Sequence, residues 1–233
     1  MKTLGQFQES LANLREELAG YCNKFGRDEG SVSILPVTKR QPMEAVEYSE
    51  KAGFPTVGEN LVQEGVRKAN EYPGTMEWEL IGHLQSNKAK SAVEIFSRIQ
   101  SVDSAKLLRR LDRLSGEAGK TLRILLQVNT AKDPAKHGIQ PEDAPALIET
   151  ALACPHLLLE GFMTIGRLSP DPADAEEAFS SLQELRIQMQ DRFNQNFPEL
   201  SMGMSGDLEM AVKCGSTQVR VGTTLFGERP PPS

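Results

Sequence analysis

The residue with the clearest chemical potential is Lys39, which ends an apolar run over residues 33–38. That run predicts the first β-strand of the chain. A lysine that is partly desolvated in a barrel mouth, or that lies near Arg220, has a lowered pKa and is nucleophilic at neutral pH. Its amine would then hold an aldehyde as a Schiff base. The alternative is a solvated lysine that, with Arg40, forms a basic rim.

A second group of residues, toward the end of the chain, predicts a phosphate site. Ser205 and Gly206 precede a short helical pattern over 207–212. Ser205 is expected to cap that helix, and its first turn to offer free N–H groups to an anion. Gly222 and Thr223 follow the last apolar run and add further N–H groups and a hydroxyl. The alternative is two capped turns without a ligand.

Charged residues beside this cradle refine the prediction. Asp207 and Glu209 would repel a phosphate, so both are expected to point away from it. Three roles are open to Arg220: a phosphate ligand, an ion-pair partner, or a donor to a pyridine nitrogen. In the third role the permanently protonated arginine would leave the ring nitrogen unprotonated and the ring a weaker electron sink. Lysine, cradle and arginine together suggest pyridoxal 5'-phosphate (PLP).

The elements that must position these residues alternate regularly. Residues 3–25 carry apolar side chains at helical spacing and predict a leading helix. Eight apolar runs follow, near 32–38, 55–58, 78–82, 97–102, 122–128, 157–165, 199–203 and 217–221. Polar, periodic stretches of helical length lie between them, at 42–52, 60–71, 105–119, 141–153 and 173–193.

This alternation predicts an α/β fold, a single (β/α)8 TIM barrel with an extra N-terminal helix. We expect one domain over 1–233, with the leading helix in 1–30 and a frayed tail at 230–233. An open doubly wound sheet is the alternative, but no G-x-G-x-x-G follows the first strand. Pro36 conflicts with a barrel strand, because proline removes a ladder donor. We expect either a bulge at Pro36 or a strand that begins after it.

Polar or unusual residues lie at the carboxyl end of each predicted strand, and many of them directly follow the apolar run. Functional residues of this barrel gather at the carboxyl ends of strands, whereas each residue taken singly could be a helix cap or turn residue. His83 is interpreted as an acid/base or a structural histidine, and Lys136 and His137 as part of a polar loop. The residues at the strand ends are Lys39, Glu59, Asn60, His83, Asp103, Asn129, Met163, Thr164, Met204, Ser205, Arg220, Gly222 and Thr223.

Composition narrows the function classes. The net charge of −6 argues against nucleic acid as the main partner. The three cysteines lack metal-ligand spacing and the three histidines are expected to form no ligand cluster, so no metal site is predicted. No signal peptide and no apolar stretch of membrane-spanning length is evident. We expect a cytoplasmic protein with free thiols and no membrane partner.

The chain resembles the pyridoxal phosphate homeostasis proteins, one-domain relatives of the alanine racemase barrel. The resemblance runs in order from about residue 34 to residue 229. Its segments from residue 82 to 88 and from 201 to 207 are highly specific. The matching segments are 37–39, 57–64, 81–88, 126–129, 161–165, 201–207 and 219–223.

The resemblance implies a fold-type-III PLP protein that serves vitamin B6 balance, with PLP-dependent apoenzymes as partners and no established turnover. It implies a Schiff base on Lys39 and contacts to the cofactor from Asn60 and Met163. Arg220 would face the ring nitrogen. The implied phosphate ligands are Ser205, Gly206, Gly222 and Thr223.

Two other functions compete with cofactor binding. A PLP-dependent amino-acid racemase or lyase needs acid/bases on both faces of its substrate. Racemases of this fold add a second domain and a tyrosine from a partner subunit. The chain is expected to have no room for that domain, which favours a monomer, and Tyr21, Tyr48 and Tyr72 lie in helical patterns. The third candidate is a sugar-phosphate barrel enzyme that never uses the lysine covalently.

Overall fold

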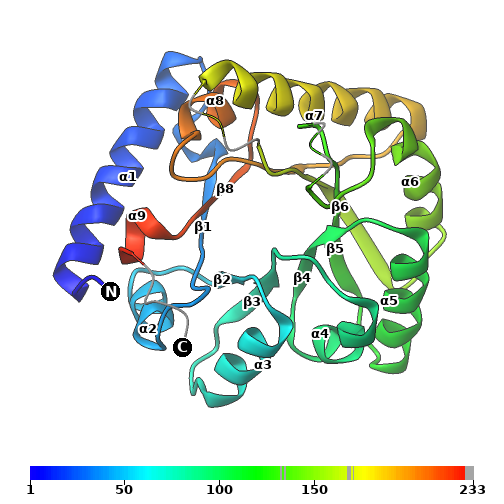
Figure 1. The fold of residues 1–233 in the computed structure, drawn as a ribbon, viewed down its shortest axis with the longest axis horizontal. Helices are drawn as coiled ribbons and strands as arrows, with labels where there is room; N and C mark the ends of the chain where they lie inside the picture. The colour runs from blue at the N-terminus through cyan, green and yellow to red at the C-terminus, as the bar shows by residue number, and fades with distance from the viewer. Residues whose placement is uncertain (132, 134, 167–168, 170, 229–233) are drawn as a thin grey trace.

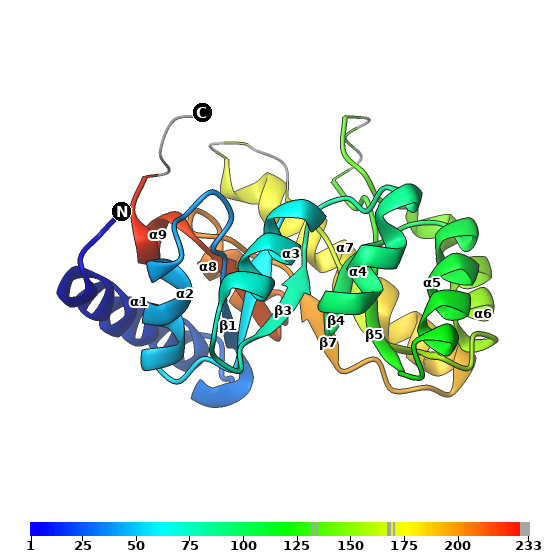
Figure 2. The same cartoon turned by 90° about the horizontal axis from the view of Figure 1, so that it is seen from below.

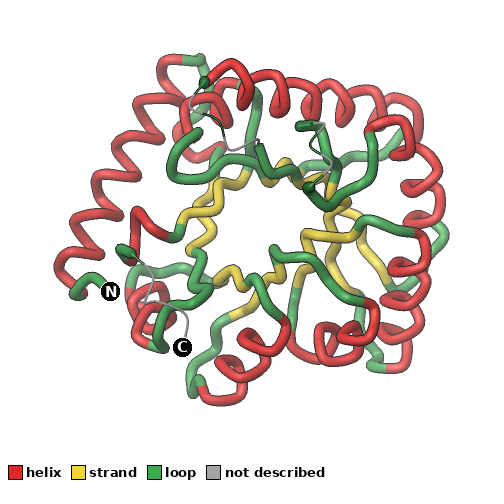
Figure 3. Tube along the Cα trace, in the orientation of Figure 1, coloured by secondary structure: helices red, strands yellow, loops and turns green. Residues whose placement is uncertain are grey.

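In the computed structural model of the chain, which describes residues 1–131, 133, 135–166, 169 and 171–228, eight parallel strands form a ring (Figures 1 and 3). The predicted fold class is confirmed. The tail at 230–233 lies outside the described residues. The strands are β1 Ser33–Pro36, β2 Thr56–Glu59, β3 Glu77–Leu80, β4 Arg98–Val102, β5 Leu122–Gln127, β6 Leu157–Met163, β7 Glu199–Ser201 and β8 Gln218–Val221.

Helices surround the ring, as Figure 3 shows in red outside the yellow strands. Two were not predicted: α4 and α9 are too short for a helical period to emerge from the sequence. Within the described residues, no helix is both long and apolar enough to cross a bilayer. The helices are α1 Leu4–Lys24, α2 Glu44–Lys51, α3 Val62–Glu71, α4 Ala89–Ile95, α5 Ala105–Glu117, α6 Ala144–Leu152, α7 Pro172–Phe193, α8 Leu208–Lys213 and α9 Thr223–Phe226.

The strands follow one another around the ring in chain order, and the ring closes weakly between β1 and β2. The seam holds an isolated bridge, Val37–Gly58, and a bond from the Thr38 amide to the Gly58 carbonyl at 3.0 Å. Both expectations for Pro36 are wrong, because β1 ends at Pro36 and pairs with β8 without a bulge. The Val37 amide donates toward β8 and that of Thr38 toward β2. Because successive backbone amides point to opposite neighbours, the Pro36 nitrogen faces β2 across the seam. No ladder hydrogen bond is therefore lost at Pro36.

The hydrophobic core lies between the ring and its helices. In α5, Leu107, Leu111 and Leu114 recur at helical spacing and are buried, and the Ser104 hydroxyl caps the helix by accepting from the Leu107 amide. Each such helix turns an apolar stripe toward the sheet and leaves its polar face in water. This packing holds the strand ends, and the side chains that follow them, in place.

The leading helix α1 packs on the outside of the ring, beside α8 and α9 (Figures 1 and 2). A capping box formed by Thr3 and Gln6 starts it. Its buried stripe includes Phe7, whose ring stacks on Phe226 with 5.4 Å between centroids. Lys2 donates to the Thr224 carbonyl at 2.7 Å. The helix thus braces the short α9 that follows the last strand.

Candidate functional site

A cavity of about 210 Å³ lies at the carboxyl ends of the strands. Its apolar wall includes Val37, Ile81 and Ile165, and it brings together segments that lie far apart in the sequence. All predicted site residues except Met163 line it: Lys39, Asn60, Ser205, Gly206, Arg220, Gly222 and Thr223.

Met163 is the exception among the predicted site residues. It is the last residue of β6 and is fully buried, and it does not line the cavity. Ile165, two residues further on, lines the wall instead. A contact of Met163 with a ligand stays a prediction.

Lys39 lies three residues beyond the end of β1, in a turn at the cavity wall. Its ammonium approaches the Asn60 side-chain oxygen at 3.5 Å. Arg40, next in the chain, has φ 56°, a left-handed conformation that non-glycine residues seldom adopt. Gly82 completes this wall, since any Cβ there would collide with the Asn60 carbonyl. The backbone around Lys39 and Asn60 is therefore sterically specified.

A buried charge network holds the turn from behind. Lys68 of α3 is fully buried and uses all three ammonium hydrogens, on the Thr38 carbonyl at 2.7 Å and on Glu59 and Glu64 at 2.8 and 2.9 Å. Glu64 also accepts from the Arg40 amide at 2.7 Å. The residues on either side of Lys39 are thus tied to one helix, so the lysine side chain leaves a fixed base.

Glu59 is the fully buried carboxyl of this network. Burial raises its pKa, and Lys68 and the Thr38 hydroxyl oppose that shift. Its second carboxylate oxygen is buried without a hydrogen-bond partner among the described residues. Lys68 and the Thr38 hydroxyl are therefore the groups that favour the charged form of Glu59 at this buried position. The sequence pattern indicates that Glu59 lies at a strand end, but it does not predict the buried role of Lys68. The one sequence feature of Lys68 that points to a charge pair is its i,i+4 spacing from Glu64.

The loops after β7 and β8 form the predicted anion cradle. Within the described part of the chain, the Ser205, Gly206 and Thr223 amides donate to no backbone carbonyl, and the Ser205 and Thr223 hydroxyls have no protein partner. A Cβ on Gly222 would lie 3.1 Å from the Val37 carbonyl, a tight contact, so a larger residue there would push this loop and β1 slightly apart. These free donors around one cavity suit an anion such as phosphate.

Ser205 does not cap α8, contrary to expectation, because that helix begins at Leu208 and its N-cap residue is Asp207. The Asp207 carboxylate instead accepts from the Met204 amide at 2.5 Å and fastens the loop. Burial raises the pKa of Asp207, opposed by that hydrogen bond and by Arg220. Glu209 pairs with Lys24 of α1 at 2.6 Å, so it faces away from the cradle as expected.

Arg220 of β8 supplies a buried cation to the cavity. It donates to the Ser201 hydroxyl at 2.7 Å and to the Thr164 carbonyl at 2.8 Å. Burial lowers the pKa of Arg220 to about 10, with Asp207 opposing the shift. The guanidinium therefore remains charged at neutral pH. Its two bonds to the protein fix its plane at the cavity wall.

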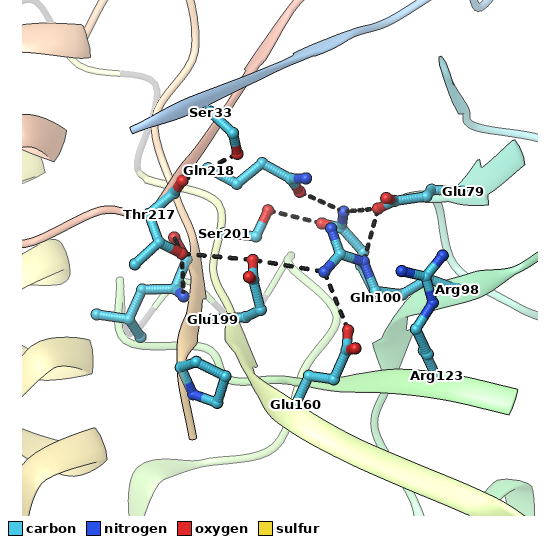
Figure 4. Close-up of polar contacts among 12 residues, drawn as sticks. Ser33, Glu79, Arg98, Gln100, Arg123, Glu160, Glu199, Ser201, Thr217 and Gln218 are labelled. Atoms are coloured by element: carbon cyan, nitrogen blue, oxygen red, sulfur yellow. Dashed lines mark hydrogen bonds and ion pairs between the residues drawn. The ribbon is translucent and has the colours of Figure 1, made fainter. Parts of the chain in front are cut away.

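The Ser201 hydroxyl that accepts from Arg220 begins a polar chain through the inside of the barrel. Figure 4 shows the part of this chain from Ser201 to Arg98. Ser201 donates to Gln100 at 2.6 Å, and the Gln100 amide donates to Glu79 at 2.5 Å. Glu79 accepts from Arg98 at 2.8 Å. Burial lowers the pKa of Arg98, but Glu79 and neighbouring carboxylates outweigh it, so the net shift is upward. The orientation of Arg220 thus depends on residues of three other strands.

A larger cavity of about 510 Å³ adjoins the first and shares Ile165, Met204, Ser205 and Gly206 with it. Tyr21 of α1 and Lys136 lie on its wall. The Lys136 ammonium donates to the Ile165 and Gly166 carbonyls, which holds the loop after β5 against the segment after β6. The shared loop over 204–206 is therefore reachable from both sides.

The expectation that the histidines form no ligand cluster is wrong for two of them. The rings of His83 and His137 stack with 3.9 Å between centroids, and His83 also pairs with Asp103 at 3.5 Å. These residues follow β3, β4 and β5, and none lines the 210 Å³ cavity. His156 pairs separately with Asp112 at 3.3 Å. Sequence spacing could not show this cluster, because a long loop brings His137 back to the rim.

Comparison with known proteins places this geometry in a family. The profile described as alanine racemase, N-terminal domain, matches residues 10–230. The chain is 37% identical over 226 residues to the pyridoxal phosphate homeostasis protein of Haemophilus influenzae, covering 95% of each. It is 38% identical over 227 residues to the protein of that name from Vibrio cholerae, covering 95% of this chain and 96% of the other.

Solved structures agree with the sequence comparison. PipY of Synechococcus elongatus, in its structure with PLP bound, matches with a TM-score of 0.83 and 37% identity, covering 95% of this chain and all of that one. An alanine racemase of Clostridium difficile matches with a TM-score of 0.80, but at 14% identity and over 60% of its length it shares only the fold. The chain therefore belongs to the pyridoxal phosphate homeostasis proteins, within the family of the alanine racemase N-terminal domain.

Proposed function

We propose that this protein binds PLP covalently through Lys39 and serves PLP homeostasis by holding the cofactor and passing it to PLP-dependent apoenzymes. One observation carries the proposal: Lys39, a charged and buried Arg220 and a set of free N–H and hydroxyl donors line the same cavity. A relative at 37% identity has been solved with PLP bound.

The residues present fit the cofactor. When bound, PLP would supply an aldehyde, and the Lys39 amine is the nucleophile at the cavity wall that would condense with it, with release of one water molecule. Asn60 orients that amine. Arg220 would donate to the ring nitrogen and keep it unprotonated, because the guanidinium itself stays charged. The phosphate would be held by Ser205, Gly206, Gly222 and Thr223.

The direct test is an absorbance spectrum of the full-length protein with added PLP, before and after borohydride. We expect a visible band that reduction abolishes, with the adduct mapped to the peptide that contains Lys39. A protein that stays colourless, or an adduct on another lysine, would refute the covalent role of Lys39. A colourless protein that still binds sugar phosphates would favour the third candidate function.

The cradle predicts a measurable loss of affinity in a double variant. Ser205→Ala with Thr223→Val removes two hydroxyl donors to a dianion, each worth roughly 1.5–3 kcal/mol as a charge-assisted bond. Cofactor affinity in equilibrium dialysis should fall at least about tenfold. Thr224→Val is a matched control, because Thr224 follows Thr223 in α9 but does not line the cavity. Unchanged affinity in the double variant would mean that the backbone amides of the cradle suffice, or that the phosphate lies elsewhere.

We expect no significant racemase, transaminase or decarboxylase turnover, because no second acid/base residue for the opposite face of a substrate was identified among the described residues. A ring nitrogen left unprotonated by Arg220 stabilises a carbanion poorly. The hydrogen bond to Glu17, then burial, raises the pKa of Tyr21 to about 12, which makes its phenolate a scarce base at neutral pH. Tyr72 donates to Glu50 on the outer helices.

The measurement is α-proton exchange of L- and D-alanine in deuterated water, followed by NMR. Exchange should stay at the background rate while the protein transfers PLP to an apoenzyme. Exchange at many turnovers per second, lost in Lys39→Ala, would favour the racemase alternative instead.

A further inference from the structure

The stacked histidines form a cluster with the composition of a metal site. His83, Asp103 and His137 follow three consecutive strands, β3, β4 and β5, at the carboxyl-end rim of the barrel. One ligand atom from each residue lies within 4.8 Å of the other two. Two imidazoles and a carboxylate are ligands that zinc prefers. None of the three residues lines either cavity described above.

One pair of ligand atoms already has a spacing close to that of a zinc centre. The His83 Nδ1 and the Asp103 carboxylate lie 3.5 Å apart. Zinc bonds of about 2.0–2.2 Å in a tetrahedron place neighbouring ligand atoms roughly 3.3 Å apart. The two rings are nearly parallel, with 10° between their planes. Parallel rings cannot both aim a lone pair at one ion, so binding must turn one ring out of the stack.

The backbones that carry these side chains are already held in place. The Ser101 hydroxyl donates to the carbonyl of Gly82, next to His83, at 2.6 Å. The Gln127 side chain donates to the His137 carbonyl at 3.0 Å. The Asn129 amide donates to the Ile139 carbonyl at 2.8 Å and so returns the loop to β5. Only side-chain rotation separates the cluster from a ligand geometry.

We propose that His83, Asp103 and His137 bind a zinc ion. Three protein ligands leave a fourth position open, and the exposure of His83 and His137 gives the ion a path from solvent. The ion would tie the loop that carries His137 to the ends of β3 and β4. Zinc binding at this site requires neither PLP nor Lys39, so its test is independent of the test of the proposed function.

The test is isothermal titration of ZnCl2 into the full-length protein after chelator treatment, with and without PLP. We expect one ion per chain in both states, and an affinity at least about tenfold lower in His83→Ala, His137→Ala and Asp103→Asn. His156→Ala is the matched control, because His156 also pairs with an aspartate but lacks a second histidine. Binding that is absent, or equally tight in the ligand variants, would overturn the proposal.

A second measurement guards against variants that fail to fold. The chain has three histidines, so nitrogen NMR of the wild-type imidazoles should give three sets of ring signals, each with an Nδ1 and an Nε2 resonance. Zinc should shift two of them and leave the signal of His156 in place, as the His156→Ala spectrum identifies it. A shift of His156, or of none, would contradict a site at the His83–His137 stack.

Discussion

Lys39→Ala should abolish the visible band of the PLP-loaded protein and its reduction by borohydride. No other lysine lines the 210 Å³ cavity among the described residues, so no amine can replace it there. Residual binding through the cradle and Arg220 should remain, because neither is altered. Spectral titration measures the band, and equilibrium dialysis measures the remaining affinity.

Lys88→Ala is the matched control for this variant. Lys88 follows β3 on the same side of the barrel and is half-buried, but it does not line the cavity. Its loss should leave the band unchanged. A band that survives in Lys39→Ala, or one that is lost in Lys88→Ala, would assign the covalent link to a different residue.

Lys68→Met should destabilise the fold by about 3–5 kcal/mol, since removing one partner of a buried pair leaves the other charge uncompensated. Lys68 and Glu59 are both fully buried, and Lys68 also holds the Thr38 carbonyl beside Lys39. The variant should therefore also loosen the base from which Lys39 extends. Urea unfolding measures the free energy of unfolding.

The matched control is Arg67→Ala, the preceding residue in the same helix. Arg67 pairs with Glu71 at 2.8 Å on the surface, where both side chains are more than half exposed. Such exposed pairs contribute roughly 0.2–1 kcal/mol. A similar loss in both variants would mean that helix propensity, and not the buried charge, determines the effect.

The free energy of unfolding of Lys68→Met should depend on pH differently from that of the wild type. Burial raises the pKa of Glu59 and Lys68 lowers it, so Lys68→Met should raise it further. A carboxyl whose pKa is raised in the folded state stabilises the folded protein while it is protonated. This contribution to the free energy of unfolding is complete below the unfolded pKa of about 4.3, and it is lost as the pH rises through the folded pKa. The deficit of Lys68→Met relative to wild type should therefore grow as the pH rises above the folded-state pKa of Glu59 in the wild type, which is itself raised. Adding Glu59→Gln should remove that growth.

The barrel and most of the residues around the candidate cavity can be predicted from the amino-acid sequence. Alternating apolar runs and helical stretches permit few topologies, and in a parallel barrel every strand ends on the same face. Polar residues at or just beyond the carboxyl end of a strand, such as Lys39, Asn60 and Arg220, are therefore neighbours whatever the details of packing. Met163 shows the limit of that reasoning, because the last residue of a strand can point away from the cavity.

The side chains that support the site could be identified only in the folded structure. Lys68 has the sequence pattern of a surface helix pair, and its burial against Thr38 and Glu59 depends on how α3 docks on the sheet. The link from Arg220 through Ser201 to Gln100 crosses the barrel interior. Such contacts join residues distant in sequence, and helical or strand periodicity carries no information about them. The strand alternation predicted where the cavity lies, but side-chain packing alone determined what holds its residues in place.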